Sequence, residues 1–276
     1  FKQKTAYEIG VRLVGSEMCI RDSETIMRLG PQSVLAFVIE PIGGQATGVN
    51  VPDPSFIPGA REICTRHGVA LVFDEIVTAF RTGVPFVAHD FPDALPDIIT
   101  VAKGLGAGYA PLGAVLTSAE MADELADSTG FVVSHSYDAC PMACAAGSAV
   151  LDEIVEHDLV ANAARVGAHL GARLRSLAAQ HALIGDVRGR GLLQAIELVA
   201  EPTTAARFPA HIDPGAVVLQ IGLAHGLLLY SRRQNGGAFG DWLLVAPPLT
   251  IDEALADTIV DRLSAALTEA AAQLTP

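Results

Sequence analysis

Three ionisable residues in this sequence have the types needed for chemistry on a carbonyl group: Glu40, Asp74 and Lys103. The chain contains only three lysines, and Lys103 is the only one after Lys4, although there are fifteen arginines. A genome that favours arginine codons explains the scarcity of lysine, but it does not explain why a single lysine remains. Because lysine can lose its proton and attack a carbonyl carbon whereas arginine cannot, Lys103 is the first candidate nucleophile.

Each of these residues directly follows a predominantly apolar run. The runs cover residues 34–39, 69–73 and 98–102, and such runs are typical of strands buried on both faces. Alternation of these strands with helices predicts an α/β fold with a mainly parallel sheet and flanking helices. The carboxyl ends of parallel strands meet at one edge of a sheet, where ligands bind, so we expect the three side chains to share that edge.

A lone lysine with an aspartate opposite it suggests a site for pyridoxal 5'-phosphate (PLP). The amine of Lys103 would form a Schiff base with the cofactor aldehyde. A carboxylate at Asp74 would raise the pKa of the pyridine nitrogen and keep that nitrogen protonated. Once substrate has displaced the lysine, its free amine is placed to move a proton.

Other reaction classes find little support in the sequence. A P-loop ATPase needs the pattern G-x-x-x-x-G-K-[ST], but Lys103-Gly104 is followed by Leu105. The G-x-S-x-G elbow of a serine hydrolase is absent from the sequence. The eight histidines show no metal-ligand spacing, so we expect no metal site.

The rest of the chain divides into a helical middle and a second α/β part. Helices are predicted at 141–156 and 159–180, and Val187–Gly191 is predicted to be a turn into the next strand. The pattern then predicts a strand at 192–198, a helix at 215–224, strands at 227–230 and 242–245, and a last helix from Asp252.

We expect a domain boundary near Gly185. It would separate a partial PLP-binding large domain at 24–184 from a small C-terminal α/β domain at 185–276. Residues 1–23 show no sustained period, and the peptide LVGSEMCIRDS within them resembles a translated sequencing adapter. We therefore expect residues 1–23 to be an artefactual or disordered segment.

Two long motifs resemble the signature of the class III (omega-type) PLP-dependent aminotransferases of fold type I. They are LVFDEIVTAFRTG at 71–83 and PDIITVAKGLGAGYAPLGAVL at 96–116. Four further segments match the same family in order and spacing: VIEPIGG, HSYDACPMACAA, VRGRGLLQAIEL and WLLVAPPLTI. The family's Gly-Ser phosphate loop and ring-stacking aromatic would precede this chain. The resemblance therefore implies the C-terminal part of a longer enzyme, which by itself would bind PLP weakly and turn over no substrate.

The resemblance assigns a role to five residues. Lys103 would be the Schiff-base lysine, and Asp74 would bind the pyridine nitrogen. Ile76 would pack against one face of the cofactor ring, and Glu40 would lie near the cofactor and the substrate. Ser136 stands where the family usually has a threonine that reaches the cofactor phosphate of the neighbouring subunit, which implies a homodimer with a shared active site.

The implied activity is transfer of an amino group from an amine or amino acid to a 2-oxo acid. A PLP-dependent aminomutase of the glutamate-1-semialdehyde type, a racemase, and an inactive chain that keeps only the fold remain alternatives. Gln45 stands where members that use glutamate often carry a gating glutamate. Arg232 or Arg233 could bind a substrate carboxylate, although arginines in loops are more often merely solvated.

The amino-acid composition further restricts the classes of molecule that the protein is expected to bind. With 31 acidic and 18 basic residues the formal net charge is −13, which disfavours binding to a nucleic-acid phosphate backbone. No apolar run reaches membrane-spanning length, no signal segment opens the chain, and four cysteines are too few for a disulfide scaffold. We expect a cytoplasmic protein that acts on small molecules and binds neither nucleic acid nor membrane.

Overall fold

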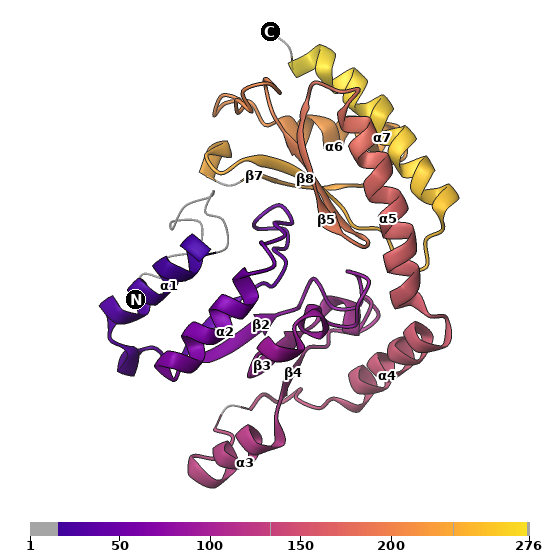
Figure 1. Ribbon diagram of the computed structural model, residues 1–276. Coiled ribbons are helices and arrows are strands. Elements are labelled where there is room, and N and C mark those ends of the chain that lie inside the picture. Colours follow the sequence, from indigo (N-terminus) through magenta and orange to yellow (C-terminus); the bar gives the residue numbers. More distant parts are fainter. Residues whose placement is uncertain (1–15, 133, 234, 275–276) are drawn as a thin grey trace.

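Two four-stranded sheets, each with its own helices, make up the computed structural model, which describes residues 16–132, 134–233 and 235–274 (Figure 1). In the first sheet, β1 (Ala36–Ile39), β2 (Ala70–Asp74) and β3 (Ile98–Val101) run parallel in that order. The fourth strand, β4 (Ala114–Thr117), pairs antiparallel with β3. The predicted α/β fold with a parallel sheet is confirmed.

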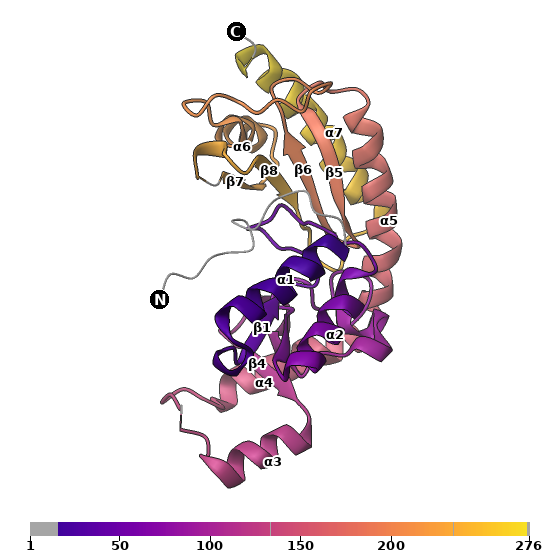
Figure 2. The same cartoon turned by 60° about the vertical axis from the view of Figure 1, so that its left-hand side comes forward.

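Helices α1 (Ser16–Leu29) and α2 (Phe56–His67) lie together beside the first sheet (Figure 2). Apolar residues of both helices are buried in one core with the strands; among them are Ile26, Ile57, Ile63, Leu71 and Phe73. Helix α2 ends at Gly68, whose φ of +65° suits glycine as a left-handed C-cap. Helix α1 begins at Ser16 and so includes part of the segment that the sequence analysis set aside.

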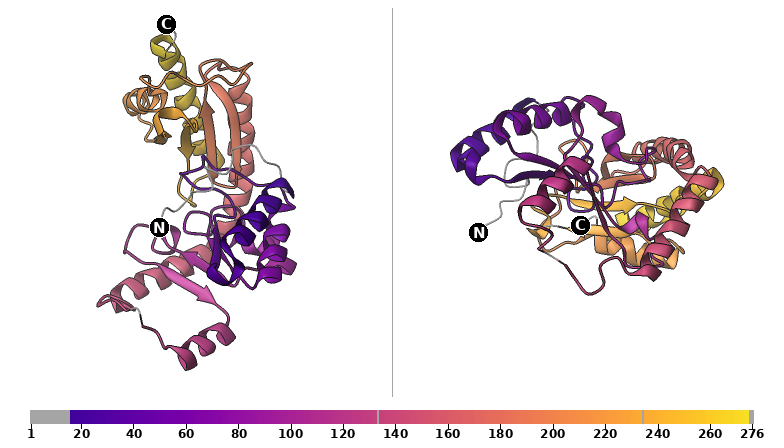
Figure 3. Two further views of the ribbon diagram at one scale, coloured as in Figure 1. Left: turned by 90° about the vertical axis from the view of Figure 1, so that its left-hand side faces the viewer. Right: turned by 90° about the horizontal axis from the view of Figure 1, so that it is seen from below.

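The helical middle consists of three helices. Helix α3 (Ala119–Ser128) extends away from both sheets (Figure 3), and its N-cap Ser118 accepts a hydrogen bond from the backbone N–H of Met121. Helix α4 (Pro141–Glu156) follows. We call each sheet with its packed helices a layer, and α5 (Leu159–Ala178) runs from the layer of the first sheet along the layer of the second sheet.

The second sheet is antiparallel, with strand order β5-β6-β8-β7. Its strands are β5 (Ile184–Arg190), β6 (Leu193–Leu198), β7 (Tyr230–Arg233) and β8 (Asp241–Val245). The expected turn at 187–191 is wrong: these residues belong mostly to β5, and the turn is confined to Gly191 and Leu192. Gly185 and Gly189 interrupt the apolar alternation of β5, which is why the strand was missed.

Strand β8 is buried on both faces, so alternate residues serve two cores. Leu243 and Val245 pack with helices α5, α6 (Pro214–Ala224) and α7 (Glu253–Leu274). Trp242 and Leu244 instead face the first layer. Because α5 contributes buried residues such as Leu170 and Leu174, the core of the second layer begins before the predicted boundary near Gly185.

Glu75 anchors the segment that follows β2. Its carboxylate is fully buried and accepts hydrogen bonds from the backbone N–H groups of Val87 (2.7 Å) and Ala88 (3.0 Å) and from the Thr78 hydroxyl (2.9 Å). Burial raises the pKa of Glu75 although these hydrogen bonds act in the opposite direction.

Glu75→Gln should destabilise the protein by roughly 1–3 kcal/mol, because the new amide NH2 group would face buried N–H donors and leave one of them unpaired. Urea unfolding at pH 7 measures the loss. The matched control is Glu62→Gln on the exposed side of α2, which should change the free energy of unfolding by less than about 0.5 kcal/mol. Equal stability of the two variants would contradict an anchoring role for Glu75.

Candidate active site

The register of the first sheet brings the ends of its parallel strands to one edge. Ile39 pairs with Phe73, and Phe73 pairs with Ile99. Glu40 directly follows β1, Asp74 is the last residue of β2, and Lys103 comes shortly after β3. The structure therefore brings these three predicted site residues together.

The environment of Glu40 reflects this proximity. Burial raises the pKa of its carboxyl, and a hydrogen bond from the backbone N–H of Gly44 to Glu40 Oε2 (3.0 Å) lowers it. The charge of Asp74 raises this pKa further and that of Lys103 lowers it. Glu40 is thus within electrostatic range of both Asp74 and Lys103.

Asp74 and Ile76 are linked through a local turn. The Asp74 carboxylate accepts a hydrogen bond from the backbone N–H of Ile76 at 3.0 Å, and both side chains are half-buried. This contact fixes one carboxylate oxygen and leaves the other without a hydrogen bond from the described part of the chain. Ile76 lies at the same edge of the sheet, where it could contact a planar ligand.

Lys103 begins a short 3-10 turn, Lys103–Leu105, and its backbone φ is +39°. This left-handed conformation is unfavourable for a residue other than glycine, and such strain often occurs at functional sites. The side chain is exposed, and within residues 16–132, 134–233 and 235–274 no salt bridge holds it. An unbridged primary amine at one sheet edge with an aspartate is a donor set that fits PLP.

Ser136 lies apart from these residues within the chain. It is exposed in the loop between α3 and α4, in a turn where the backbone N–H of His135 donates to Asp138 Oδ2 (2.6 Å). No hydrogen bond connects Ser136 with Glu40, Asp74 or Lys103 in the described residues. Its predicted role at a neighbouring subunit's site stays a prediction.

The two arginines considered for substrate binding lie in strand β7, not in a loop. Arg233 donates to the backbone carbonyls of Pro209 (3.3 Å), Ala210 (3.3 Å), Gly236 (2.7 Å) and Ile212. It also lies 3.3 Å from Asp241 Oδ1. These contacts give Arg233 a structural task, whereas Arg232 is exposed.

Asp241 is 1% exposed, and neither of its carboxylate oxygens has a hydrogen-bond partner among the described residues. Burial raises its pKa to about 6 from 3.8, although the charge of Arg233 acts to lower it. Because the folded state holds this proton more tightly than the unfolded state, the contribution of Asp241 to stability decreases as pH rises from about 4 to about 6.

Asp241→Asn should remove this pH-dependent loss, which amounts to roughly 3 kcal/mol at most. The variant should therefore gain stability relative to the unaltered chain as pH increases from 4 to 6. Urea unfolding of both proteins at several pH values tests this expectation. Parallel stability curves for the two proteins would show that Asp241 does not titrate in this range.

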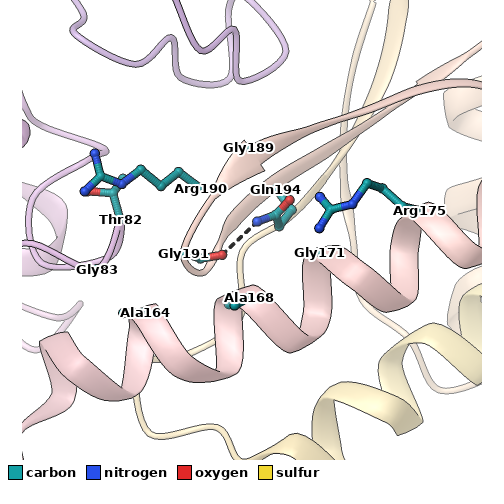
Figure 4. A pocket seen from close by; sticks show the side chains of 11 residues that line it. Thr82, Gly83, Ala164, Ala168, Gly171, Arg175, Gly189, Arg190, Gly191 and Gln194 are labelled. Atoms are coloured by element: carbon teal, nitrogen blue, oxygen red, sulfur yellow. Dashed lines mark hydrogen bonds between the residues drawn. The ribbon is translucent and has the colours of Figure 1, made fainter. Parts of the chain in front are cut away.

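A cavity of about 290 Å3 lies elsewhere, between α5 and the turn that joins β5 to β6 (Figure 4). Gln194 lines it and donates through Nε2 to the carbonyl of Gly191 at 2.9 Å. Glu40, Asp74 and Lys103 do not line this cavity, so it is separate from the sheet-edge site. No described helix has the length and apolarity to cross a membrane, and no cluster of three metal-binding side chains occurs in the same residues.

Known proteins are similar to this chain in sequence and in fold. The sequence model of the family Aminotransferase class-III matches residues 2–267. A diaminobutyrate–2-oxoglutarate transaminase of Halomonas elongata is 35% identical over 258 residues, which cover 91% of this chain and 53% of that protein. An omega-aminotransferase of Caulobacter vibrioides is 35% identical over 247 residues, covering 87% of this chain and 52% of that protein.

Solved structures agree with these sequence relatives. A transaminase from the marine bacterium Virgibacillus superposes with a TM-score of 0.89 at 30% identity, covering 95% of this chain and 58% of its own. A PLP-bound amine transaminase from an uncultivated Pseudomonas species has a TM-score of 0.84 at 35% identity, covering 92% and 56%. The chain spans about half the length of the proteins it matches.

Proposed function

Because the chain belongs to the class-III aminotransferase family, we propose that the protein transfers an amino group from an amine or amino acid to a 2-oxo acid with PLP as cofactor. The observation that carries the proposal is the convergence of Glu40, Asp74 and Lys103 at one sheet edge. PLP, when bound, supplies an electron-accepting ring for the bond at the substrate α-carbon.

The chain's own residues have distinct tasks in this proposal. Lys103 holds the cofactor through its Nζ, and that amine then moves the proton of the reacting carbon. Asp74 holds a proton on the ring nitrogen, which its fixed, half-buried carboxylate supports. Ile76 packs on the ring, and Glu40 sets the charge next to Lys103.

We extend the proposal to assembly and location. Ser136 would complete the phosphate site of a second copy, since it is exposed in the loop between α3 and α4, and the enzyme would act as a homodimer. A cytoplasmic location is supported by Cys64, Cys140 and Cys144, which are free thiols.

Borohydride reduction in the presence of PLP tests the site. Peptide mapping should find the pyridoxyl group on Lys103 and not on Lys2 or Lys4, the other two lysines of the chain. In a separate sample that has not been reduced, incubation with an amino donor alone should convert PLP to pyridoxamine 5'-phosphate and release an oxo product. Label elsewhere would contradict the assignment of Lys103.

Incubation with an amino donor alone also distinguishes transamination from racemisation and from aminomutase activity. A racemase would invert the donor without release of an oxo product, and an aminomutase would return an isomer of its own substrate. A chain that keeps only the fold would acquire no label at Lys103. Any one of these three outcomes would therefore contradict the proposed transamination.

A further inference from the structure

The loop at 41–50, which we name the β1 loop, determines the hydrogen bonding of Glu40. Its ends are joined by a hydrogen bond from the Gly43 N–H to the Asn50 carbonyl (2.8 Å). Inside it, the N–H of Val49 donates to the Gly44 carbonyl (3.1 Å), and the N–H of Gly44 donates to Glu40 Oε2 (3.0 Å). The position of this loop therefore decides where the Gly44 N–H meets the Glu40 carboxylate.

Two side chains of the second sheet hold the β1 loop from outside. Trp242 of β8 donates through Nε1 to the carbonyl of Gln45 at 2.8 Å. Arg188 of β5 donates through Nε to the carbonyl of Gly48 at 2.6 Å. Arg188 is itself held by Glu197, whose carboxylate lies 2.7 Å from its Nη1.

The packing around these two hydrogen bonds is tight. Trp242 is fully buried in one apolar cluster with Ile42 and Val49 of the β1 loop. Gly48 has a φ of +65°, and a Cβ there would lie 2.8 Å from both Trp242 and Arg188. Glycine at this position thus allows both side chains to close on the loop.

We propose that Trp242 and Arg188 are positioning residues for Glu40, which they hold in place beside Lys103 through the β1 loop. The catalytic meaning of this inference rests on the proposed function, since Glu40 faces a cofactor only if Lys103 binds one. The positioning itself does not depend on a cofactor, so the two claims can fail separately.

A measurable consequence concerns the Glu40 carboxyl. Burial has the largest effect on the pKa of Glu40 and raises it. The hydrogen bond from the Gly44 N–H comes next and lowers this pKa, and the charge of Asp74 raises it to a smaller extent. If the loop is released, this hydrogen bond is lost and the pKa of Glu40 should rise. Lys103 and Asp74 also act on this carboxyl, but they lie after β3 and at the end of β2, outside the β1 loop, and neither is substituted.

The experiment uses the cofactor-free chain labelled with carbon-13 at glutamate side chains. Trp242→Phe keeps an aromatic ring of smaller volume and removes the Nε1–H donor, whereas Arg188→Lys keeps the charge beside Glu197 and removes the Nε–H donor. We expect a higher pKa of Glu40 in both variants by NMR titration. Hydrogen exchange of the Gly44 amide should become about tenfold faster, as for the loss of one hydrogen bond.

Arg190→Gln is the matched control. Arg190 of β5 pairs with Asp90 and so also joins the two layers, but its side-chain hydrogen bonds and ion pair among the described residues go to Asp90 and not to the β1 loop. It should leave the Glu40 pKa and the Gly44 exchange rate unchanged. An equal effect of this control, or unchanged values in both test variants, would overturn the inference. PLP titration of the same proteins reports separately on the proposed function.

Discussion

In the full-length enzyme that the family resemblance implies, replacing Lys103 with alanine should abolish covalent attachment of PLP and reduce transamination by roughly 10⁴-fold or more, because the amine serves both as attachment point and as proton carrier. Borohydride labelling and steady-state turnover measure the two losses independently. Lys103 is exposed and outside any salt bridge of the described residues, so the substitution removes little packing. We therefore expect far-ultraviolet circular dichroism and unfolding to stay close to those of the unaltered chain.

Lys103→Arg is the matched control for charge. Arginine keeps the positive charge that lowers the pKa of Glu40, but its guanidinium stays protonated near neutral pH and so cannot attack the cofactor aldehyde. Both variants should be inactive to a similar degree. Wild-type labelling by borohydride in Lys103→Ala would show that another group binds the cofactor.

Asp74→Asn should retain PLP but reduce turnover by roughly 10²–10⁴-fold, because a neutral amide cannot keep the ring nitrogen protonated. The asparagine oxygen can still accept the hydrogen bond from the Ile76 N–H, so the turn after β2 should persist. The measurements are kcat for transamination and the dissociation constant of PLP from an absorbance titration.

Asp74→Glu is the informative companion, since it keeps the charge but moves it by one methylene. It should lose less activity than the asparagine variant. If Asp74→Asn retained most of its activity, Asp74 would be a structural turn residue, and the proposed protonation of the ring would need another donor.

The parallel part of the first sheet was predictable because its signals are local. Continuous apolar runs gave β1, β2 and β3, and a polar residue after each run gave Glu40, Asp74 and Lys103. Helix α4 likewise matches its predicted range of 141–156. The antiparallel direction of β4 depends on its pairing with β3, which no local pattern encodes.

The contacts of the site with the second layer were not predictable in the same way. Trp242 and Gln45 are 197 residues apart, and Arg188 and Gly48 are 140 apart, so no spacing rule connects them. Arg233 was expected in a loop, but pairing with β8 makes it a strand residue. Three of its four carbonyl partners, Pro209, Ala210 and Ile212, come from the segment before α6, and only the folded chain brings them near.

The left-handed backbone of Lys103 implies a trade-off between stability and function at this position. Glycine adopts a φ of +39° with little penalty, whereas a residue with a Cβ loses on the order of 1 kcal/mol there. The replacement that would best relax the backbone is thus one that deletes the amine. Stabilising substitutions chosen by backbone preference alone would remove the candidate nucleophile, so any effort to make this protein more robust has to keep Lys103 and gain its stability elsewhere.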